Sequence, residues 1–290
     1  MRARIFLAAG LFAWAFHSSQ ALVIFGGTGT QQLTPPASDP GWANVGSRGV
    51  YLGNYGGEYW VATATHVGAG AITFGSTSYS AVPGSAVSIL NPNSTPTDLT
   101  LFRITSDPGL ATLALATTAP ASNAVVRLVG NGGIENVYTK YDVTETTWTV
   151  STSDPFDAQG YTVTSSAGKR WGDSTVGGTA DYSLGAVTSN GVYTVFSAIN
   201  GSSQGAGGDS GGAMFSYNGS SWELAGILSA ISTYDGQPGG TAIVGNLTWG
   251  LNIAYYRPAI LAAIPEPADV ALWVAVIAAG VGIWRRRRQR

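Results

Sequence analysis

The chain has 290 residues, with 14 Lys and Arg against 16 Asp and Glu, and no cysteine. The lack of cysteine excludes a small disulfide-stapled scaffold and, with only two histidines, a His-rich or Cys-rich zinc site. Residues 22–264 carry seven basic and fourteen acidic side chains, and this net charge of −7 excludes a surface that gathers nucleic acid. Acidic side chains alone could still hold calcium, although the sequence has no calcium-binding motif.

The first 21 residues have the order of a secretory signal peptide. Arg2 and Arg4 precede an apolar run from Ile5 to Phe16, and the polar stretch that follows ends in Ser19-Gln20-Ala21. Signal peptidase accepts small side chains at these two positions, so the sequence predicts cleavage after Ala21. An N-terminal membrane anchor is the alternative, but it needs a longer apolar run of about 18 residues.

Between residues 22 and 264, short runs of Val, Ile, Thr, Tyr and Phe alternate with clusters of Gly, Ser, Asn and Pro. This pattern is typical of an all-β sandwich or barrel, and the length suffices for one large β domain or two small barrels. We expect a long excursion over 151–181 and a short amphipathic helix over 257–263. The expected strands are 49–52, 59–64, 71–74, 99–104, 124–129, 146–152, 191–198 and 224–229.

His66 is the one imidazole of the expected mature chain, because His17 lies in the signal peptide. It follows the apolar run Val61-Ala62-Thr63-Ala64, and a strand that leads into a small-residue turn can present a base at the rim of a barrel. A single histidine is nevertheless more often structural than catalytic. Its interpretation therefore depends on the segments that follow.

Two downstream segments carry a carboxylate and a hydroxyl. Asp98 opens the apolar run Leu99–Ile104, which can place its carboxylate near a core, although such an aspartate is usually a cap or turn residue. Ser210 lies in Gly207-Gly208-Asp209-Ser210-Gly211-Gly212, where glycine allows the hydroxyl and nearby amides to approach a substrate closely. Even with 40 glycines, the sequence Gly-Asp-Ser-Gly-Gly within this run arises by chance on the order of a few times per thousand such chains.

The three segments, in the order His, Asp, Ser, resemble the chymotrypsin-like (trypsin fold) serine peptidases. The resemblance implies two six-stranded antiparallel β-barrels with a short C-terminal helix over residues 22–264. It implies His66 as general base, Asp98 as the residue that orients it and Ser210 as nucleophile, with oxyanion-hole amides at Gly208 and Ser210. It also implies a polypeptide substrate and no cofactor. The chain departs from the family in having no disulfide, and in Thr65 and Ala213.

The same resemblance implies further roles. Asp209 would pair with a mature N-terminal amine, for which Ile24-Phe25-Gly26-Gly27 is the candidate start; the alternative is that this segment is simply a first strand. Gln204, Ser229 and Ile231 would line the substrate pocket. Without a carboxylate to pair with a cation, and with branched Ile231 in place of a glycine, this pocket would favour Ala, Val or Thr over Lys or Arg.

The C-terminal end, residues 265–290, has the order of a sorting and anchoring segment. Pro265-Glu266-Pro267 precedes the apolar run 268–284, and the basic tail 285–290 follows. The run is about 26 Å long as a helix, near the short limit for a transmembrane span, and its arginines are expected on the cytoplasmic side. The order resembles the PEP-CTERM sorting signal of Gram-negative bacteria. An ordinary C-terminal anchor is the alternative.

The PEP-CTERM resemblance implies export across the inner membrane and a sorting enzyme of the exosortase type as partner. The chain would be anchored by its C-terminus, or released to the cell surface after processing.

These observations predict an exported serine endopeptidase that works through an acyl-enzyme intermediate. One alternative is a catalytically degenerate surface-binding or matrix β-protein, because nine tryptophans and thirteen tyrosines could bind glycans. The retention of His66, Asp98 and Ser210 in their contexts argues against it. An esterase is a third possibility, but the strand-turn-helix nucleophile elbow is absent around Ser210.

Overall fold

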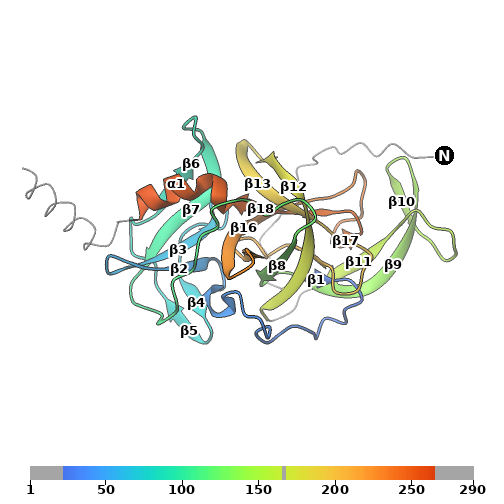
Figure 1. Ribbon diagram of the computed structural model, residues 1–290. Helices are drawn as coiled ribbons and strands as arrows, with labels where there is room; N and C mark the ends of the chain where they lie inside the picture. Colours follow the sequence, from blue (N-terminus) through green and yellow to red (C-terminus); the bar gives the residue numbers. More distant parts are fainter. Residues whose placement is uncertain (1–21, 165–167, 265–290) are drawn as a thin grey trace, which may run out of the picture.

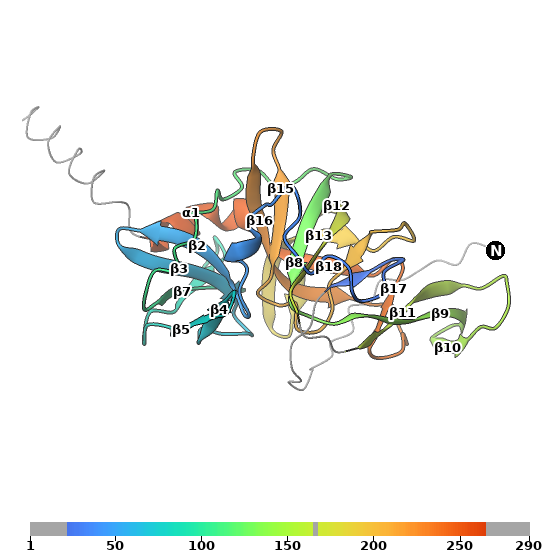
Figure 2. The same ribbon diagram turned by 90° about the horizontal axis from the view of Figure 1, so that it is seen from below.

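The computed structural model describes residues 22–164 and 168–264. These residues form mainly antiparallel strands, with one 3-10 turn, η1 (Trp42–Asn44), and one α-helix, α1 (Ile253–Ala263). An N-terminal sheet, a barrel and a side sheet follow one another along the molecule (Figures 1 and 2). The predicted all-β class is confirmed, and each of the eight expected strand segments overlaps an observed strand.

In the N-terminal half, the strands form an open four-stranded sheet and a two-stranded hairpin, so the second of the two predicted barrels is not confirmed. The strand order of the sheet is β2 (Val50–Tyr55), β3 (Glu58–Ala64), β7 (Pro96–Ile104) and β6 (Val87–Leu90), and β4 (Ile72–Phe74) pairs only with β5 (Thr77–Tyr79). The free edge of β4 bonds to a turn instead of a strand, because Thr73 exchanges hydrogen bonds with Ser47. The hairpin still packs on the sheet through Tyr51, Val61, Ile72, Phe74, Phe102 and Ile104.

The C-terminal half contains a closed six-stranded barrel, as the resemblance implied. Its order is β12 (Arg170–Leu184), β13 (Val187–Val195), β18 (Leu247–Asn252), β16 (Trp222–Ser232), β15 (Ala213–Tyr217) and β8 (Val125–Gly130), which returns to β12. Alternation of apolar side chains fills the barrel with Val126, Leu128, Val176, Val192, Met214 and Leu228. The barrel is the rigid support from which the Ser210 loop projects.

A four-stranded side sheet extends from the barrel. Its order is β10 (Thr147–Val150), β9 (Ile134–Thr144), β11 (Ala158–Thr164) and β17 (Thr241–Ile243). The expected excursion over 151–181 is therefore wrong in large part, since β11 and most of β12 lie within it. The short strand β1 (Val23–Ile24) pairs with β14 (Ser203–Gln204) beside this sheet.

Helix α1 returns to the N-terminal half, where it lies over β6 and β7 in Figure 1. The Asn252 side chain caps it by accepting a hydrogen bond from Tyr255 N at 3.3 Å. The helix begins four residues before the expected start at 257, because the cap, and not Pro258, fixes its first turn. It buries Ile253, Tyr256 and Ile260 in the core that spans both halves.

Among residues 22–164 and 168–264, no helix is both long and apolar enough to cross a membrane. The predicted signal peptide 1–21, transmembrane run 268–284 and basic tail 285–290 lie outside the described residues.

Candidate active site

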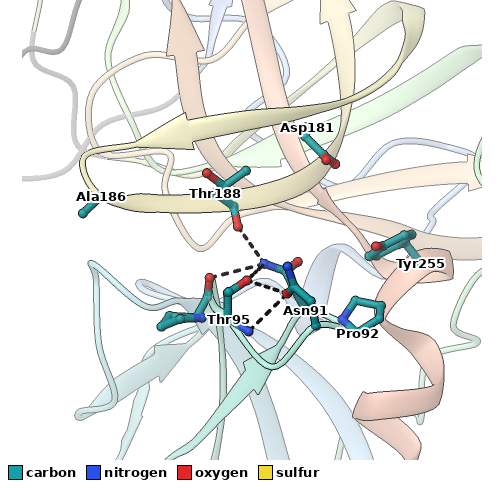
Figure 3. A pocket seen from close by; sticks show the side chains of 9 residues that line it. Asn91, Pro92, Thr95, Asp181, Ala186, Thr188 and Tyr255 are labelled. Atoms are coloured by element: carbon teal, nitrogen blue, oxygen red, sulfur yellow. Dashed lines mark hydrogen bonds between the residues drawn. The ribbon is translucent and has the colours of Figure 1, made fainter.

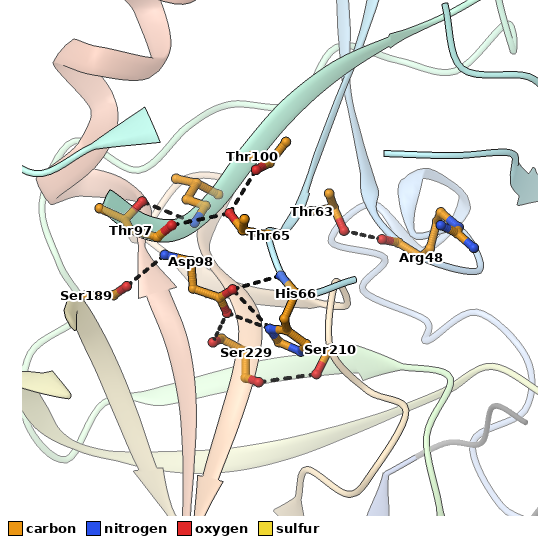
Figure 4. A network of polar contacts seen from close by, with 11 residues as sticks. Arg48, Thr63, Thr65, His66, Thr97, Asp98, Thr100, Ser189, Ser210 and Ser229 are labelled. Atoms are coloured by element: carbon orange, nitrogen blue, oxygen red, sulfur yellow. Dashed lines mark hydrogen bonds and ion pairs between the residues drawn. The ribbon is translucent and has the colours of Figure 1, made fainter. Parts of the chain in front are cut away.

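His66 and Asp98 are brought together by two neighbouring strands. Ala64 at the end of β3 pairs with Leu99 of β7, so the residues just beyond this pair face one another. His66 N donates to Asp98 Oδ1 at 3.0 Å, and His66 Nδ1 lies 2.8 Å from Asp98 Oδ2 (Figure 4). Because a carboxylate only accepts hydrogen bonds, Nδ1 carries the hydrogen and Nε2 is left with a free lone pair.

The Asp98 carboxylate is almost fully buried, with 5% of its side chain exposed. Ser229 of β16 donates its hydroxyl to Asp98 Oδ2 at 2.5 Å, and Asp98 N donates to Ser189 Oγ of β13 at 2.9 Å. A buried carboxylate is stable only when donors replace its lost hydration. Ser229 bonds to the carboxylate and Ser189 to the main chain of Asp98, and both lie in the barrel, so the C-terminal half helps to fix the acid that the N-terminal half supplies.

Ser210 lies in a tight turn between β14 and β15. Gly208 and Gly211 adopt positive φ angles of +96° and +85°. A Cβ on Gly211 would lie 2.4 Å from the carbonyl oxygen of Arg48, so only glycine fits there. The Ser210 hydroxyl donates to Ser229 O at 3.2 Å, and within the described residues no hydrogen bond joins it to His66. Ser229 thus contacts both Ser210 and Asp98 (Figure 4).

The amides predicted to form an oxyanion hole are those of Gly208 and Ser210. Within the part of the chain that the structure describes, neither N–H donates to an acceptor, whereas Asp209 N, Gly211 N and Gly212 N all do. Gly208 is exposed and Ser210 is half-buried. Both N–H groups are therefore free to donate to a bound group, which the predicted role requires.

Main-chain amides hold Asp209 in the uncleaved chain, in which the predicted partner, a mature N-terminal amine, is not formed. The buried carboxylate of Asp209 accepts from Gly132 N at 2.5 Å and Ala206 N at 2.8 Å. Burial raises the pKa of Asp209 to about 8, while the Ala206 hydrogen bond and the charge of Arg170 oppose the shift. Residues 23–24 form a short strand, which is the alternative given above for this segment. The main-chain N–H of Ile24 donates to Glu135 Oε2.

The predicted pocket residues divide into two places. Ile231 pairs with Thr248, and a Cβ on Gly205 would lie 2.8 Å from Thr248 Cγ2 and 3.6 Å from Ile231 Cγ2. Gln204 precedes Gly205, is 1% exposed and donates to Leu247 O at 3.3 Å. Gln204 and Ile231 therefore lie near one end of the barrel, whereas the Ser229 side chain is committed to Asp98.

A cavity of about 570 Å³ lies away from these residues, between the β6–β7 turn, the β12–β13 hairpin and α1 (Figure 3). Asn91 crosses this junction by donating to Thr188 O at 2.9 Å, and Tyr256 donates its hydroxyl to Asn91 Oδ1. None of the predicted site residues lines the cavity. It marks the contact between the two halves.

Sequence reasoning missed several residues that support the site. Ser189 contacts Asp98 from a strand 91 positions away, and the paired side chains of Glu135 and Arg170 bond to the backbone of residues 22–31. Ser189 lies in the polar run Thr188-Ser189-Asn190, which offers no signal that would single it out. Among the described residues, no three His, Asp or Glu side chains are grouped so as to hold a metal ion.

No family model and no curated protein matches the chain. Among solved structures, the active form of the Rv3671c protease from M. tuberculosis is 14% identical, with a TM-score of 0.46 over 89% of this chain and 96% of that chain. The murine norovirus NS6 protease is 15% identical, with a TM-score of 0.40 over 73% of this chain and 92% of that chain. At such low values the activity has to be argued from this chain's own side chains.

Proposed function

We propose that this chain is a chymotrypsin-like serine endopeptidase with Ser210 as nucleophile, His66 as general base and Asp98 as the orienting acid. The observation that carries the proposal is the continuous contact from His66 through Asp98 and Ser229 to Ser210. A serine hydroxyl is a weak nucleophile until a neutral, oriented imidazole takes its proton. The Asp98 carboxylate supplies the orientation.

The proposed reaction has two halves. Rotation of the Ser210 side chain away from Ser229 O turns its hydroxyl toward His66 Nε2, which takes the proton as Oγ attacks the substrate carbonyl. The Gly208 and Ser210 amides bind the oxyanion, and His66 then gives the proton to the leaving amine as the peptide bond breaks. Water, deprotonated by His66, hydrolyses the acyl-enzyme and restores Ser210.

Substrate preference follows from the chemistry of the pocket. We propose that Gln204 and Ile231 disfavour Lys and Arg before the scissile bond and favour Ala, Val or Thr. A buried substrate cation without a carboxylate partner loses hydration that nothing replaces. A peptide-library profile tests this, and preference for Arg or Lys over Ala would contradict it. A gain of large residues in Ile231→Gly would support it.

Export and sorting are proposed from the two ends of the sequence. Residues 1–21 would direct export across the inner membrane of a Gram-negative bacterium. Residues 265–290 would anchor the chain until an exosortase-type enzyme acts on Pro265-Glu266-Pro267. Detection of the chain in the cytoplasm after pulse labelling, with Met1 retained, would contradict this route.

A fluorophosphonate probe, which reacts only with an activated serine, tests the proposed activity. We expect labelling of the native chain and its loss on heating and in Ser210→Ala, with no loss in the matched control Ser220→Ala on an exposed turn. Peptide and ester substrates are then compared to separate a peptidase from an esterase. Absence of labelling in the folded chain would favour the degenerate surface-binding protein.

A further inference from the structure

The most deeply buried charges outside the catalytic set are those of Arg170 and Glu135. Their side chains are 0% and 1% exposed, and two hydrogen bonds of 2.9 and 3.0 Å join them side by side. Burying such a pair is costly unless further hydrogen bonds satisfy both groups. The groups that satisfy this pair therefore indicate what it is for.

Those groups belong to the backbone of the N-terminal segment, defined here as residues 22–31. Glu135 accepts from Ile24 N and Gly29 N, each at 2.8 Å, while Arg170 donates to Leu22 O and Gln31 O, each at 2.9 Å. The approach is close, because a Cβ on Gly27 would lie 2.1 Å from Glu135 Oε1. The ion pair thus holds both ends of the segment.

The N-terminal segment and Glu135 both connect to the turn that carries Ser210. Val23 and Ile24 pair with Gln204 and Ser203, the strand that leads into residues 205–212. Glu135 is also three residues after Gly132, which donates to Asp209 Oδ1, and Gly133 N donates to Gly207 O at 3.1 Å. Displacing Glu135 would therefore loosen both supports of the Gly207–Ser210 turn.

We propose that Glu135, paired with Arg170, is a positioning residue that orders the oxyanion turn, so that catalysis does not require a free N-terminal amine. The proposal rests on the proposed peptidase function and concerns how its site is kept competent. An amine at Ile24 would need Leu22 and Val23 to be removed, but both are fully buried and Leu22 O is an Arg170 partner. The ion pair thus orders the oxyanion turn without a bond between an N-terminal amine and Asp209.

The first experiment uses Ile24→Pro in the full-length chain. This change removes the N–H that bonds to Glu135 and leaves the ion pair intact, whereas the control Thr28→Pro removes an N–H that bonds only to Gln31 Oε1. We expect Ile24→Pro to slow fluorophosphonate labelling of the folded molecules by about tenfold or more, with Thr28→Pro within twofold. Circular dichroism fixes the folded fraction, so a purely structural role would leave the rate per folded molecule unchanged.

Glu135→Gln provides the second variant. This change keeps the size of the side chain and one acceptor oxygen but removes the charge. We expect kcat to fall with little change in KM. Glu135→Asp, which keeps the charge, should recover part of the lost kcat. Asp154→Asn, at the exposed Lys140 pair, is the matched control. Equal rates per folded molecule in Ile24→Pro, Glu135→Gln and the native chain would overturn the proposal.

The third experiment compares two N-termini. Ala21→Leu blocks the predicted cleavage, and mass spectrometry identifies the uncut chain. We expect the uncut chain to label within twofold of the rate of the chain that begins at Leu22. Labelling of only the cut form would overturn the proposal, whereas no labelling of either form would instead remove the proposed peptidase function on which it rests.

Discussion

The two halves of the molecule place their catalytic candidates by different means. In the N-terminal half, His66 and Asp98 meet because they follow and precede directly paired residues of β3 and β7, and Ser229 and Ser189 of the barrel then hold the acid in place. In the C-terminal half, Ser210 lies on a turn whose shape depends on Gly132, on Asp209 and, further away, on the Glu135–Arg170 pair. An open sheet can thus supply an oriented base, whereas a flexible glycine turn needs support from residues distant in sequence.

The largest effect is expected where the halves act as one unit. His66→Ala removes the base and Asp98→Asn removes the acceptor that fixes its tautomer, so each should lower kcat/KM by about 10³-fold or more while the fold is retained. Peptide hydrolysis measures kcat/KM of each purified variant, and circular dichroism measures whether its fold is retained. Unimpaired hydrolysis in His66→Ala would end the proposed mechanism.

The junction between the halves should give a smaller effect. Ser229→Ala deletes the donor to Asp98 Oδ2 but leaves the carbonyl that contacts Ser210, and a lost hydrogen bond to a charged group costs about 1.5–3 kcal/mol. We expect kcat/KM to fall by about tenfold or somewhat more. Ser189→Ala, which removes the acceptor of Asp98 N, should act in the same direction. If both variants retain full activity, the barrel does not help to hold the acid.

The same contrast explains what the sequence could predict. The motif around Ser210 and the strand contexts of His66 and Asp98 are local, so their residues could be named before the fold was known. The contact of Ser229 with Asp98 was missed, and Ser229 was assigned to the pocket, because the 131 positions between the two residues carry no local signal. The Glu135–Arg170 pair was missed for the same reason.

The errors in the fold also have local causes. The open edge of β4 depends on Ser47, a turn residue that competes with a strand for hydrogen bonds, and such competition leaves no mark on hydrophobic periodicity. The side sheet was largely missed because β9 (Ile134–Thr144) mixes buried and exposed positions without strict alternation. Helix α1 begins four residues before the expected start because its cap, Asn252, is also the last residue of β18, so no loop separates the strand from the helix.

The buried acid beside Ser210 should make the barrel half sensitive to pH. The pKa of Asp209 is about 8 in the folded chain, whereas its ordinary value is 3.8. At pH values between these two, the folded chain keeps a proton on Asp209 that the unfolded chain has released. This group therefore stabilises the fold most below about pH 4, and its contribution falls as pH rises toward 8, by up to about 1.4 kcal/mol per pH unit.

Denaturant unfolding between pH 5 and 8 measures this slope. Asp209→Asn should flatten it, whereas Asp107→Asn, at an exposed aspartate of the N-terminal half, should leave it unchanged. An identical slope in Asp209→Asn and the native chain would show that Asp209 does not titrate in this range.

The smallest effect is expected from removing the C-terminal end, although α1 joins the two halves. The helix packs through Ile253, Tyr256 and Ile260, and Ile264 closes it by donating its N–H to Ile260 O at 3.1 Å while remaining 3% exposed. All of these contacts precede Pro265, so a chain that ends at Ile264 keeps them. We expect its kcat/KM to stay within twofold of the full-length value, and the full-length chain to fractionate with membranes until it is processed. Loss of folding on this truncation would mean that residues beyond Ile264 stabilise the junction, and that the end is more than a sorting device.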